Sequence, residues 1–205
     1  MNPLSTVHSD QFEEKYPWIF KGQDKKNAET IIYITELMTP LAAMLVGATE
    51  QGICLLEFSD RIRIEKEFDD LKKSLNAVMQ HGKNQFTDQV QAELSEYFAG
   101  SRKAFEVPLH TPGNDFAQSV WKTLQQIPYG TTLSYKKQSE MMNNPKAIRA
   151  MASTNGRNRI AIIIPCHRVI GSNGSLTGYA GGIDRKKWLL QFEREHSAPS
   201  PGTLF

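Results

Sequence analysis

Cys166 is the side chain of this sequence best suited to act as a nucleophile. It belongs to residues 164–171, which read IPCHRVIG, and His167 and Arg168 follow it directly. Two neighbouring groups that can carry positive charge favour the thiolate, which is the nucleophilic form of cysteine. A buried and inert cysteine is the alternative, because free cysteines are usually of that kind. The residues around Cys166 favour a role as nucleophile over that of an inert, buried cysteine.

The residues before Cys166 have to hold it in place. Residues 160–164 read IAIII, an apolar and β-branched run that is typical of a buried strand or extended segment. Pro165 prevents a helix from continuing and removes one backbone donor. We therefore expect Cys166 to be presented at the end of a rigid, buried, extended segment.

The composition indicates a globular protein of the cell interior. The 205 residues are 40% hydrophobic and 22% charged, so the chain can form a substantial core in one or two domains. Its two cysteines, Cys54 and Cys166, form neither a disulfide framework nor a zinc-finger pattern. No apolar run approaches the ~20 residues that span a membrane, and the N-terminus lacks the pattern of a secretory signal. We expect a cytoplasmic protein without membrane association.

The charge is distributed unevenly along the chain. Residues 1–110 contain 12 Lys and Arg against 17 Asp and Glu, whereas residues 111–205 contain 12 against 5. The first part is therefore net acidic and the second net basic, although the whole chain carries only +2. A basic half joined to an acidic half favours nucleic-acid contact by the basic half. Ordinary variation of surface charge is the alternative.

The first half of the chain is expected to be a small α/β domain that follows an extension. Residues 1–29 are polar with isolated aromatics and are typical of an extension or docking arm. Residues 30–110 form the domain. Its pattern predicts strands over 31–35, 41–49 and 53–58, and helices over 64–79 and 88–98.

The second half is expected to be mainly helical, over residues 111–196, with a disordered tail at 197–205. A first helix follows Asn114, Ser134 caps a second that reaches Met142, and a third runs over 146–153 after Asn144 and Pro145. Two short helices joined by a tight turn, the second carrying basic and small residues, resemble a helix-turn-helix. A plain helical hairpin is the alternative. A last helix, after Asp184, should direct Trp188 and its apolar neighbours inward.

This second half resembles the O6-alkylguanine-DNA alkyltransferases, also called methylated-DNA–protein-cysteine methyltransferases. The motifs that carry the resemblance occur in the family's order: Pro128-Tyr129-Gly130 with Ser134-Tyr135, residues 146–151 (KAIRAM), 155–158 (NGRN), 164–171 (IPCHRVIG), 178–182 (GYAGG), 187–190 (KWLL) and Glu193. The match is strong over residues 114–196 and loose over 30–110.

The resemblance implies an architecture and a partner. The N-terminal domain would be ribonuclease-H-like, with a three-stranded sheet and helices, and the C-terminal domain a winged-helix-like helix-turn-helix. The partner would be double-stranded DNA containing O6-alkylguanine, with O4-alkylthymine as a further candidate substrate, and the protein would act as a monomer without a cofactor. Some relatives bind a structural zinc through Cys and His, but Cys54 is the one cysteine of the first domain, so we expect no metal.

The resemblance also implies a reaction. Cys166 would take the alkyl group irreversibly as a thioether, so each molecule would act once. His167, through a water and supported by Glu193, would remove the thiol proton. Tyr135 would give a proton to the departing guanine. Taken alone, Tyr135 could equally be a packed aromatic and Glu193 a solvated charge at a helix end.

The remaining implied roles concern DNA. The helix from Lys146 would lie in the minor groove, where the small Ala150 permits close approach and Arg149 fills the place of the flipped base. Asn158 would hold the turn before the nucleophile. The base pocket would be formed by Tyr179 and by the backbone of Val169 and Ala180. Taken alone, Arg149 could be a phosphate contact and Tyr179 a packed aromatic.

This chain departs from the family at some of these positions. Ala180 stands where many relatives have Ser, so only its backbone can donate. Met151, Ser153 and Thr154 replace more usual residues of the recognition helix, which would alter its fit to the groove.

Two other functions remain open at this point. A DNA-binding protein without chemistry would explain the basic half but not Cys166. A cysteine hydrolase would use Cys166 with His167, but adjacent side chains of an extended segment point to opposite sides. The number of turnovers distinguishes the three: many for a hydrolase, one for an alkyltransferase and none for a regulator.

Overall fold

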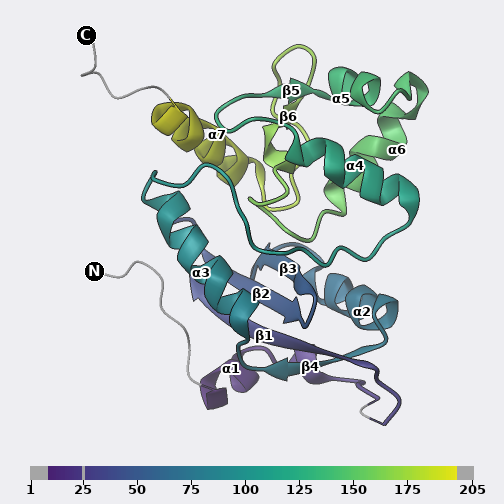
Figure 1. Ribbon diagram of the computed structural model, residues 1–205, viewed down its shortest axis with the longest axis vertical. Coiled ribbons are helices and arrows are strands. Elements are labelled where there is room, and N and C mark those ends of the chain that lie inside the picture. Colours follow the sequence, from purple (N-terminus) through teal and green to yellow (C-terminus); the bar gives the residue numbers. More distant parts are fainter. Residues whose placement is uncertain (1–8, 25, 198–205) are drawn as a thin grey trace. The chain divides into compact units, whose positions relative to one another are not determined.

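The structure is a computed structural model that describes residues 9–24 and 26–197. The chain forms two compact units, residues 1–114 and 115–205, which are coloured purple to teal and teal to yellow in Figure 1. Within the described residues, no helix is both long and apolar enough to cross a membrane. Of the tail expected at 197–205, Ser197 is the last residue of a helix and the rest lies outside the described residues.

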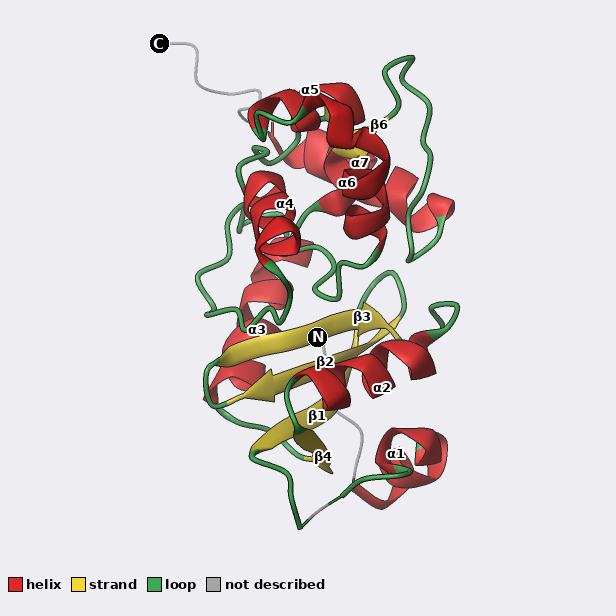
Figure 2. Ribbon diagram, turned by 90° about the vertical axis from the view of Figure 1, so that its right-hand side faces the viewer, coloured by secondary structure: helices red, strands yellow, loops and turns green. Residues whose placement is uncertain are grey.

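The first unit contains a four-stranded sheet in the order β3-β2-β1-β4 (Figure 2). Strands β1 (Thr30–Met38), β2 (Ala43–Thr49) and β3 (Gly52–Phe58) form an antiparallel meander, close to the strands predicted from the sequence. Most of their side chains are buried, and Cys54 is part of this core, with its thiol donating to the Gly47 carbonyl at 3.5 Å.

The prediction of three strands was wrong, because the sheet has a fourth. Strand β4 (Ala77–His81) pairs parallel with β1. The helix expected over 64–79 is α2, Ile64–Ser74, and it ends early. Asn76 has a positive φ of 45°, a conformation that asparagine tolerates and that a helix cannot continue through. The chain is thereby turned into the strand.

Helix α3 (Gln85–Phe98) begins three residues before the predicted start at 88, because Asn84 caps it. The Asn84 side chain accepts hydrogen bonds from the backbone N–H groups of Phe86 and Thr87, and the Thr87 hydroxyl accepts from the Asn84 N–H. This reciprocal arrangement is a capping box, which satisfies donors that a helix start leaves free.

Residues 9–20 are part of the core of the first unit, which corrects their description as an extension outside the domain. They form helix α1 (Ser9–Lys15) and the 3-10 helix η1 (Pro17–Phe20). Phe12 and Ile19 are completely buried in the same hydrophobic cluster as strand and helix residues. The buried carboxylate of Glu36 binds this segment through Lys15, at 2.7 and 3.0 Å, and through the Tyr16 hydroxyl.

The second unit is mainly helical, as expected. Its elements are α4 (Asp115–Gln125), α5 (Tyr135–Met141), η2 (Pro145–Ala147), α6 (Ile148–Gly156), η3 (Cys166–Arg168) and α7 (Ile183–Ser197), with a short parallel pair of strands, β5 (Leu133–Ser134) and β6 (Val169–Ile170). Figure 1 shows α4, α5 and α6 grouped together. Ser134 caps α5 as predicted, with its hydroxyl accepting from the Lys137 N–H at 3.1 Å.

The inward face of α7 differs from the prediction. Trp188 is 36% exposed and stacks on Phe192, with ring centroids 4.8 Å apart. The buried residues of this helix are Lys186, Leu189 and Glu193, at spacings of three and four. Two ionisable side chains therefore share the buried face of α7 with a leucine.

Candidate active site

Cys166 lies in a series of tight turns, not at the end of the extended segment that residues 160–164 predicted. The backbone N–H of Ile164 donates to Ile160 O at 3.1 Å, and that of Cys166 to Ile164 O at 2.8 Å. Ile162 has a φ of 70°, which is unfavourable for a β-branched residue. Ile160, Ile162 and Ile164 are buried, and their packing offsets the cost of the turns. Cys166 itself is 9% exposed and begins η3.

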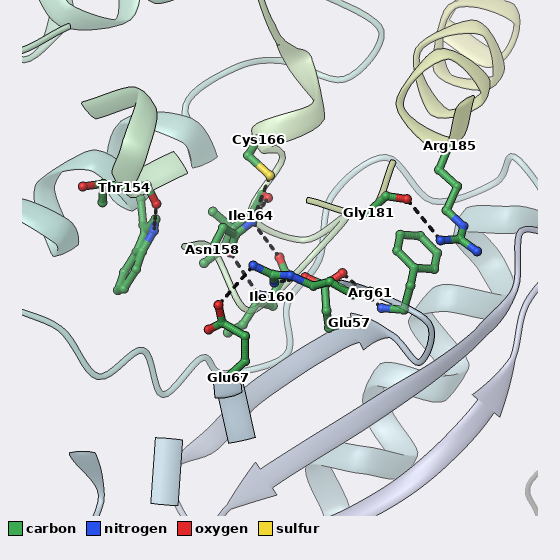
Figure 3. A network of polar contacts seen from close by, with 12 residues as sticks. Glu57, Arg61, Glu67, Thr154, Asn158, Ile160, Ile164, Cys166, Gly181 and Arg185 are labelled. Carbon is green, nitrogen blue, oxygen red and sulfur yellow. Dashed lines mark hydrogen bonds and ion pairs between the residues drawn. The ribbon is translucent and has the colours of Figure 1, made fainter. Parts of the chain in front are cut away.

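Asn158 organises these turns from within (Figure 3). Its amide nitrogen donates to Ile160 O at 3.3 Å, to Ile164 O at 2.8 Å and to the Cys166 sulfur at 3.2 Å, and its oxygen accepts from the Ile160 N–H at 2.9 Å. The Asn158 side chain thus supplies hydrogen bonds to backbone groups that would pair with a neighbouring strand in a sheet. This explains why the apolar run folds into turns, and it supports the predicted position of Asn158 before the nucleophile.

His167 and Glu193 form a buried pair. The His167 Nε2 is 2.9 Å from Glu193 Oε1, and both side chains are completely buried. Burial lowers the pKa of His167, although the hydrogen bond to Glu193 opposes the shift. The other ring nitrogen, Nδ1, is buried and has no hydrogen-bond partner among the described residues. A neutral imidazole held in this way can accept a proton at Nδ1.

Arg168 holds Glu193 rather than acting on the thiol, which the sequence did not indicate. Its Nε and Nη2 bind the two carboxylate oxygens at 2.8 and 2.9 Å, and its Nη1 donates to Ile127 O at 2.6 Å. The Gly130 N–H adds a fourth bond to this carboxylate, at 3.2 Å. Burial alone would raise the pKa of Glu193, but the bonds and charges of His167 and Arg168 outweigh it and hold the pKa at about 2.

Two tyrosines lie close to this group. Tyr135 is half-buried at the start of α5 and donates to Thr177 O at 3.2 Å; burial and the negative charge of a Cys166 thiolate raise its pKa. Tyr179 presents its ring edge-on to His167, with centroids 6.4 Å apart. The loop that carries Tyr179 is held by Arg185, which donates to Gly181 O at 3.1 Å (Figure 3).

Lys186 is a buried residue of the site that the motifs did not single out. Its ammonium donates to Val169 O at 2.6 Å and to Thr177 O at 3.0 Å. A signal for it existed in the sequence. Lys186 and Glu193 are three residues before and four after the buried Leu189, so all three fall on one face of a helix.

Arg149 and Ala150 are exposed on α6, the second helix of the predicted helix-turn-helix. Met151, Thr154 and Asn155 face the interior, where Asn155 exchanges two amide hydrogen bonds with Gln138 of α5, at 3.2 and 2.8 Å. Met151 and Thr154 are therefore buried and lie away from the outer face of α6, and their effect on the fit to a groove stays a prediction. Among these positions, only Ser153 is exposed.

The predicted residues thus occupy two regions of the second unit. One region holds Cys166 with Asn158, His167, Glu193, Tyr135 and Tyr179. Val169 and the half-buried Ala180 belong to segments that follow Cys166 in the chain. Arg149 and Ala150 lie on the outer face of α6. The arrangement combines a buried thiol, an imidazole hydrogen-bonded to a carboxylate, and a phenol.

Both units match known protein families. Residues 32–111 match the ribonuclease-like domain of 6-O-methylguanine DNA methyltransferase, and residues 115–195 match the DNA-binding domain of 6-O-methylguanine DNA methyltransferase. A methylated-DNA–protein-cysteine methyltransferase of Methanosarcina barkeri is 39% identical over 168 residues, which cover 80% of this chain and 99% of the relative. The constitutive enzyme of that name from Bacillus subtilis is 39% identical over 163 residues, 79% and 95% of the two chains.

Solved structures agree with these relatives. The crystal structure of Mycobacterium tuberculosis OGT in complex with DNA matches with a TM-score of 0.67 and 36% identity, covering 83% of this chain and 96% of that one. The α/β N-terminal and helical, DNA-binding C-terminal classes predicted from the sequence are confirmed, with a fourth strand added to the sheet. From its two matched domains and the enzymes it resembles over nearly their whole length, the chain belongs to the methylated-DNA–protein-cysteine methyltransferase family.

Proposed function

We propose that this protein repairs O6-alkylguanine in double-stranded DNA by moving the alkyl group irreversibly to its own Cys166. The observation that carries the proposal is the buried set in which Asn158 donates to the Cys166 sulfur while Glu193 binds and orients His167. A nucleophile, a base and a group that orients the base are the parts that thiol chemistry requires. The enzymes that the chain resembles are named for this transfer.

The proposed reaction is a displacement at the alkyl carbon. His167 accepts the thiol proton at Nδ1 through a bridging water, and Glu193, ionised at any ordinary pH, stabilises the imidazolium. The Cys166 sulfur forms a bond to the alkyl carbon as the bond from that carbon to guanine O6 breaks. The electron pair stays on the base, which becomes guanine when Tyr135 gives it a proton.

The product explains why each molecule acts once. The sulfur ends as a thioether, which has no ionisable proton and is a poor leaving group. Nothing in the proposed chemistry returns the thiol, so the protein is consumed as it repairs. Tyr135 is suited to the donor role because its raised pKa keeps it protonated until the base accepts the proton.

The substrate base has to leave the helix before it reaches Cys166. Flipping a base costs a few kcal/mol. We propose that α6 enters the minor groove, where Arg149 fills the vacated place in the stack and Ala150 permits close contact. Tyr179 and the backbone of Val169 and Ala180 then line the base pocket. A monomer acting in the cytoplasm, O4-alkylthymine as a further substrate, and independence from a cofactor stay predictions.

Mass spectrometry of the protein after incubation with a duplex containing one O6-methylguanine tests the proposal. We expect a gain of one methyl group per molecule, mapped to the Cys166 peptide, with no further gain at excess substrate. Cys54→Ala should still accept the methyl group, and Cys166→Ser should not. Repair of more than one lesion per molecule would indicate a hydrolase instead, and tight duplex binding without an adduct would indicate a regulator.

A further inference from the structure

Lys186 is the residue of the second unit whose burial most needs an explanation. Its side chain is 0% exposed, yet lysine is almost never fully buried unless it is paired. Among the described residues its ammonium has two carbonyl acceptors and no carboxylate partner. Burying a charge without a counter-ion costs free energy, so the buried ammonium of Lys186 points to a role in the site.

The two carbonyls belong to two segments that follow Cys166 in the chain. Val169 follows Cys166 by three residues, and Thr177 lies in the loop that leads to Tyr179. The Thr177 carbonyl also accepts the hydrogen bond of Tyr135 at 3.2 Å. One ammonium thus ties the turn of the nucleophile to the loop that positions both tyrosines.

The charge of Lys186 also acts on Cys166. Burial lowers the pKa of Lys186, and the negative charge of a Cys166 thiolate is the effect that opposes this. Electrostatic interaction is mutual, so the ammonium favours the thiolate to the same extent. The other ionisable groups around the site are Glu193 on α7, Tyr135 on α5, and His167 and Arg168 on the turn itself. Arg168 is bound to both oxygens of Glu193, whereas the charge of Lys186 is coupled to Cys166 and also lowers the pKa of His167.

We propose that Lys186 is a positioning residue of the alkyl transfer, one that pins the loop before Tyr179 to the Cys166 turn and stabilises the thiolate that forms when His167 takes the thiol proton. The inference rests on the proposed function for its importance in repair. Its effect on the thiol does not require DNA and can be measured separately.

A consequence concerns the alkylated protein. Methylation turns the sulfur into a neutral thioether, which removes the opposite charge near Lys186 while the lysine stays buried. The ammonium of the methylated protein should therefore lose its proton at lower pH than that of the unmodified protein.

The experiment compares Lys186→Met with wild type in the full chain. The rate at which iodoacetamide labels the Cys166 peptide is followed between pH 6 and 10, alongside the rate of methyl transfer from the O6-methylguanine duplex. We expect both rates at pH 7.5 to fall at least about tenfold and the pH profile to move up by about one unit, the shift equivalent to a tenfold change. Lys186→Gln, which keeps a donor without the charge, should show the same shift in pH profile.

Lys187→Met is the matched control, because Lys187 is the adjacent residue and is exposed. It should leave both profiles unchanged, and duplex binding should be the same in all variants. A folded Lys186→Met protein with wild-type rates and an unchanged pH profile would overturn the proposal. If wild type accepts no methyl group but Lys186→Met still shifts the iodoacetamide profile, the proposed function fails and the assignment of Lys186 to the thiolate stands.

Should the Lys186 variants not fold, the wild-type protein provides the test. The titration of the Lys186 ammonium is followed by nitrogen-15 NMR before and after Cys166 is methylated. A titration that moves to lower pH on methylation supports the proposal. An unchanged titration contradicts it, because the charge of Lys186 would then not sense that of the sulfur.

Discussion

Loss of Glu193 should lower both the stability of the protein and the rate of methyl transfer, because its carboxylate binds both Arg168 and His167. Glu193→Gln leaves Arg168 buried without its carboxylate, and removing one partner of a buried ion pair costs about 3–5 kcal/mol. The same change deprives His167 of its orienting group, so methyl transfer should fall by about 100-fold or more. Urea unfolding at pH 7 and single-turnover transfer measure the two effects. Glu195→Gln, on an exposed position of the same helix, should alter neither.

The lowered pKa of Glu193 predicts how stability depends on pH. A glutamate with a pKa near 4.3 when unfolded and about 2 when folded stabilises the protein fully above pH ~4.3 and loses that contribution as the pH falls toward 2. The contribution is of the order of 3 kcal/mol. Urea unfolding of wild type between pH 5 and 2.5 should show this loss, and Glu193→Gln should lack it. Equal slopes for the two proteins would contradict the role of the carboxylate as the ionised partner.

Asn158 should matter more to the protein than its single side chain suggests. Asn158→Ala removes the partner of the Ile160 N–H inside a buried turn, at about 1–3 kcal/mol for the group left unsatisfied, and it takes from Ile164 O the second of its two donors. The Cys166 turn should loosen, and we expect slower labelling of Cys166 by methyl transfer together with a lower unfolding midpoint in urea. Asn173→Ala, in an exposed turn where Asn173 accepts from the Ser175 N–H, is the control. A fall in stability without slower transfer would show that the turn does not position the sulfur.

At this scale the sequence motifs single out the candidate reacting groups but not the residues that hold them. Cys166, His167 and Glu193 follow from motifs, and the structure places His167 on Glu193. The bonds of Arg168 to Ile127 and Glu193 link residues 41 and 25 positions apart, so no local pattern could reveal them. Lys186 was accessible in principle, since its place on the buried face of a helix follows from its spacing to Leu189.

Among the elements, the loop before β5 is held to α7 by Gly130. Its φ is +72°, and a Cβ there would lie 2.5 Å from the Ser197 Cβ and 3.1 Å from Glu193 O. Gly130→Ala should therefore cost about 2 kcal/mol or more, of which the left-handed backbone alone accounts for roughly 1–2. The clash should also disturb the bond from the Gly130 N–H to Glu193 and slow methyl transfer.

Gly174→Ala isolates the backbone part of this effect. Gly174 has a φ of +82°, but no atom lies within 4 Å of the added Cβ. We expect thermal unfolding to show a smaller loss of stability than for Gly130→Ala, with transfer unchanged. Equal losses in the two variants would mean that the approach of α7 to Gly130 adds nothing.

Local capping chemistry accounts for which elements could be predicted. Ser134 marks the start of α5 and the apolar runs mark β1 to β3, so these agree with the structure. Strand β4 was missed because Asn76, in a left-handed conformation, ends α2 inside an apparently helical pattern. Residues 160–164 were misassigned because their β-branched character resembles a strand, while the side chain of Asn158, two residues earlier, imposes turns.

At the scale of the whole molecule, residues 9–20 lie outside the two domains that match the family models. The family match begins at residue 32, yet this segment places Phe12 and Ile19 in the core of the first unit and binds the buried Glu36. Isolated aromatics in a polar stretch gave no periodic signal, so the sequence predicted an extension. In the structure those aromatics form contacts with one another and with Phe68, which Trp18 meets edge-on at 5.0 Å.

Phe12→Ala in the full chain tests whether this segment stabilises the fold. Truncating a completely buried phenylalanine should cost about 3–5 kcal/mol, because the cavity adds to the lost burial. Urea unfolding, followed by far-UV circular dichroism, measures the change, and Ile62→Ala is the control because Ile62 is 83% exposed in the same unit. If Phe12→Ala were as stable as Ile62→Ala, residues 9–20 would contribute nothing measurable to the stability of the first unit. A loss of the expected size would make the segment as much a part of the first unit as the strands it covers.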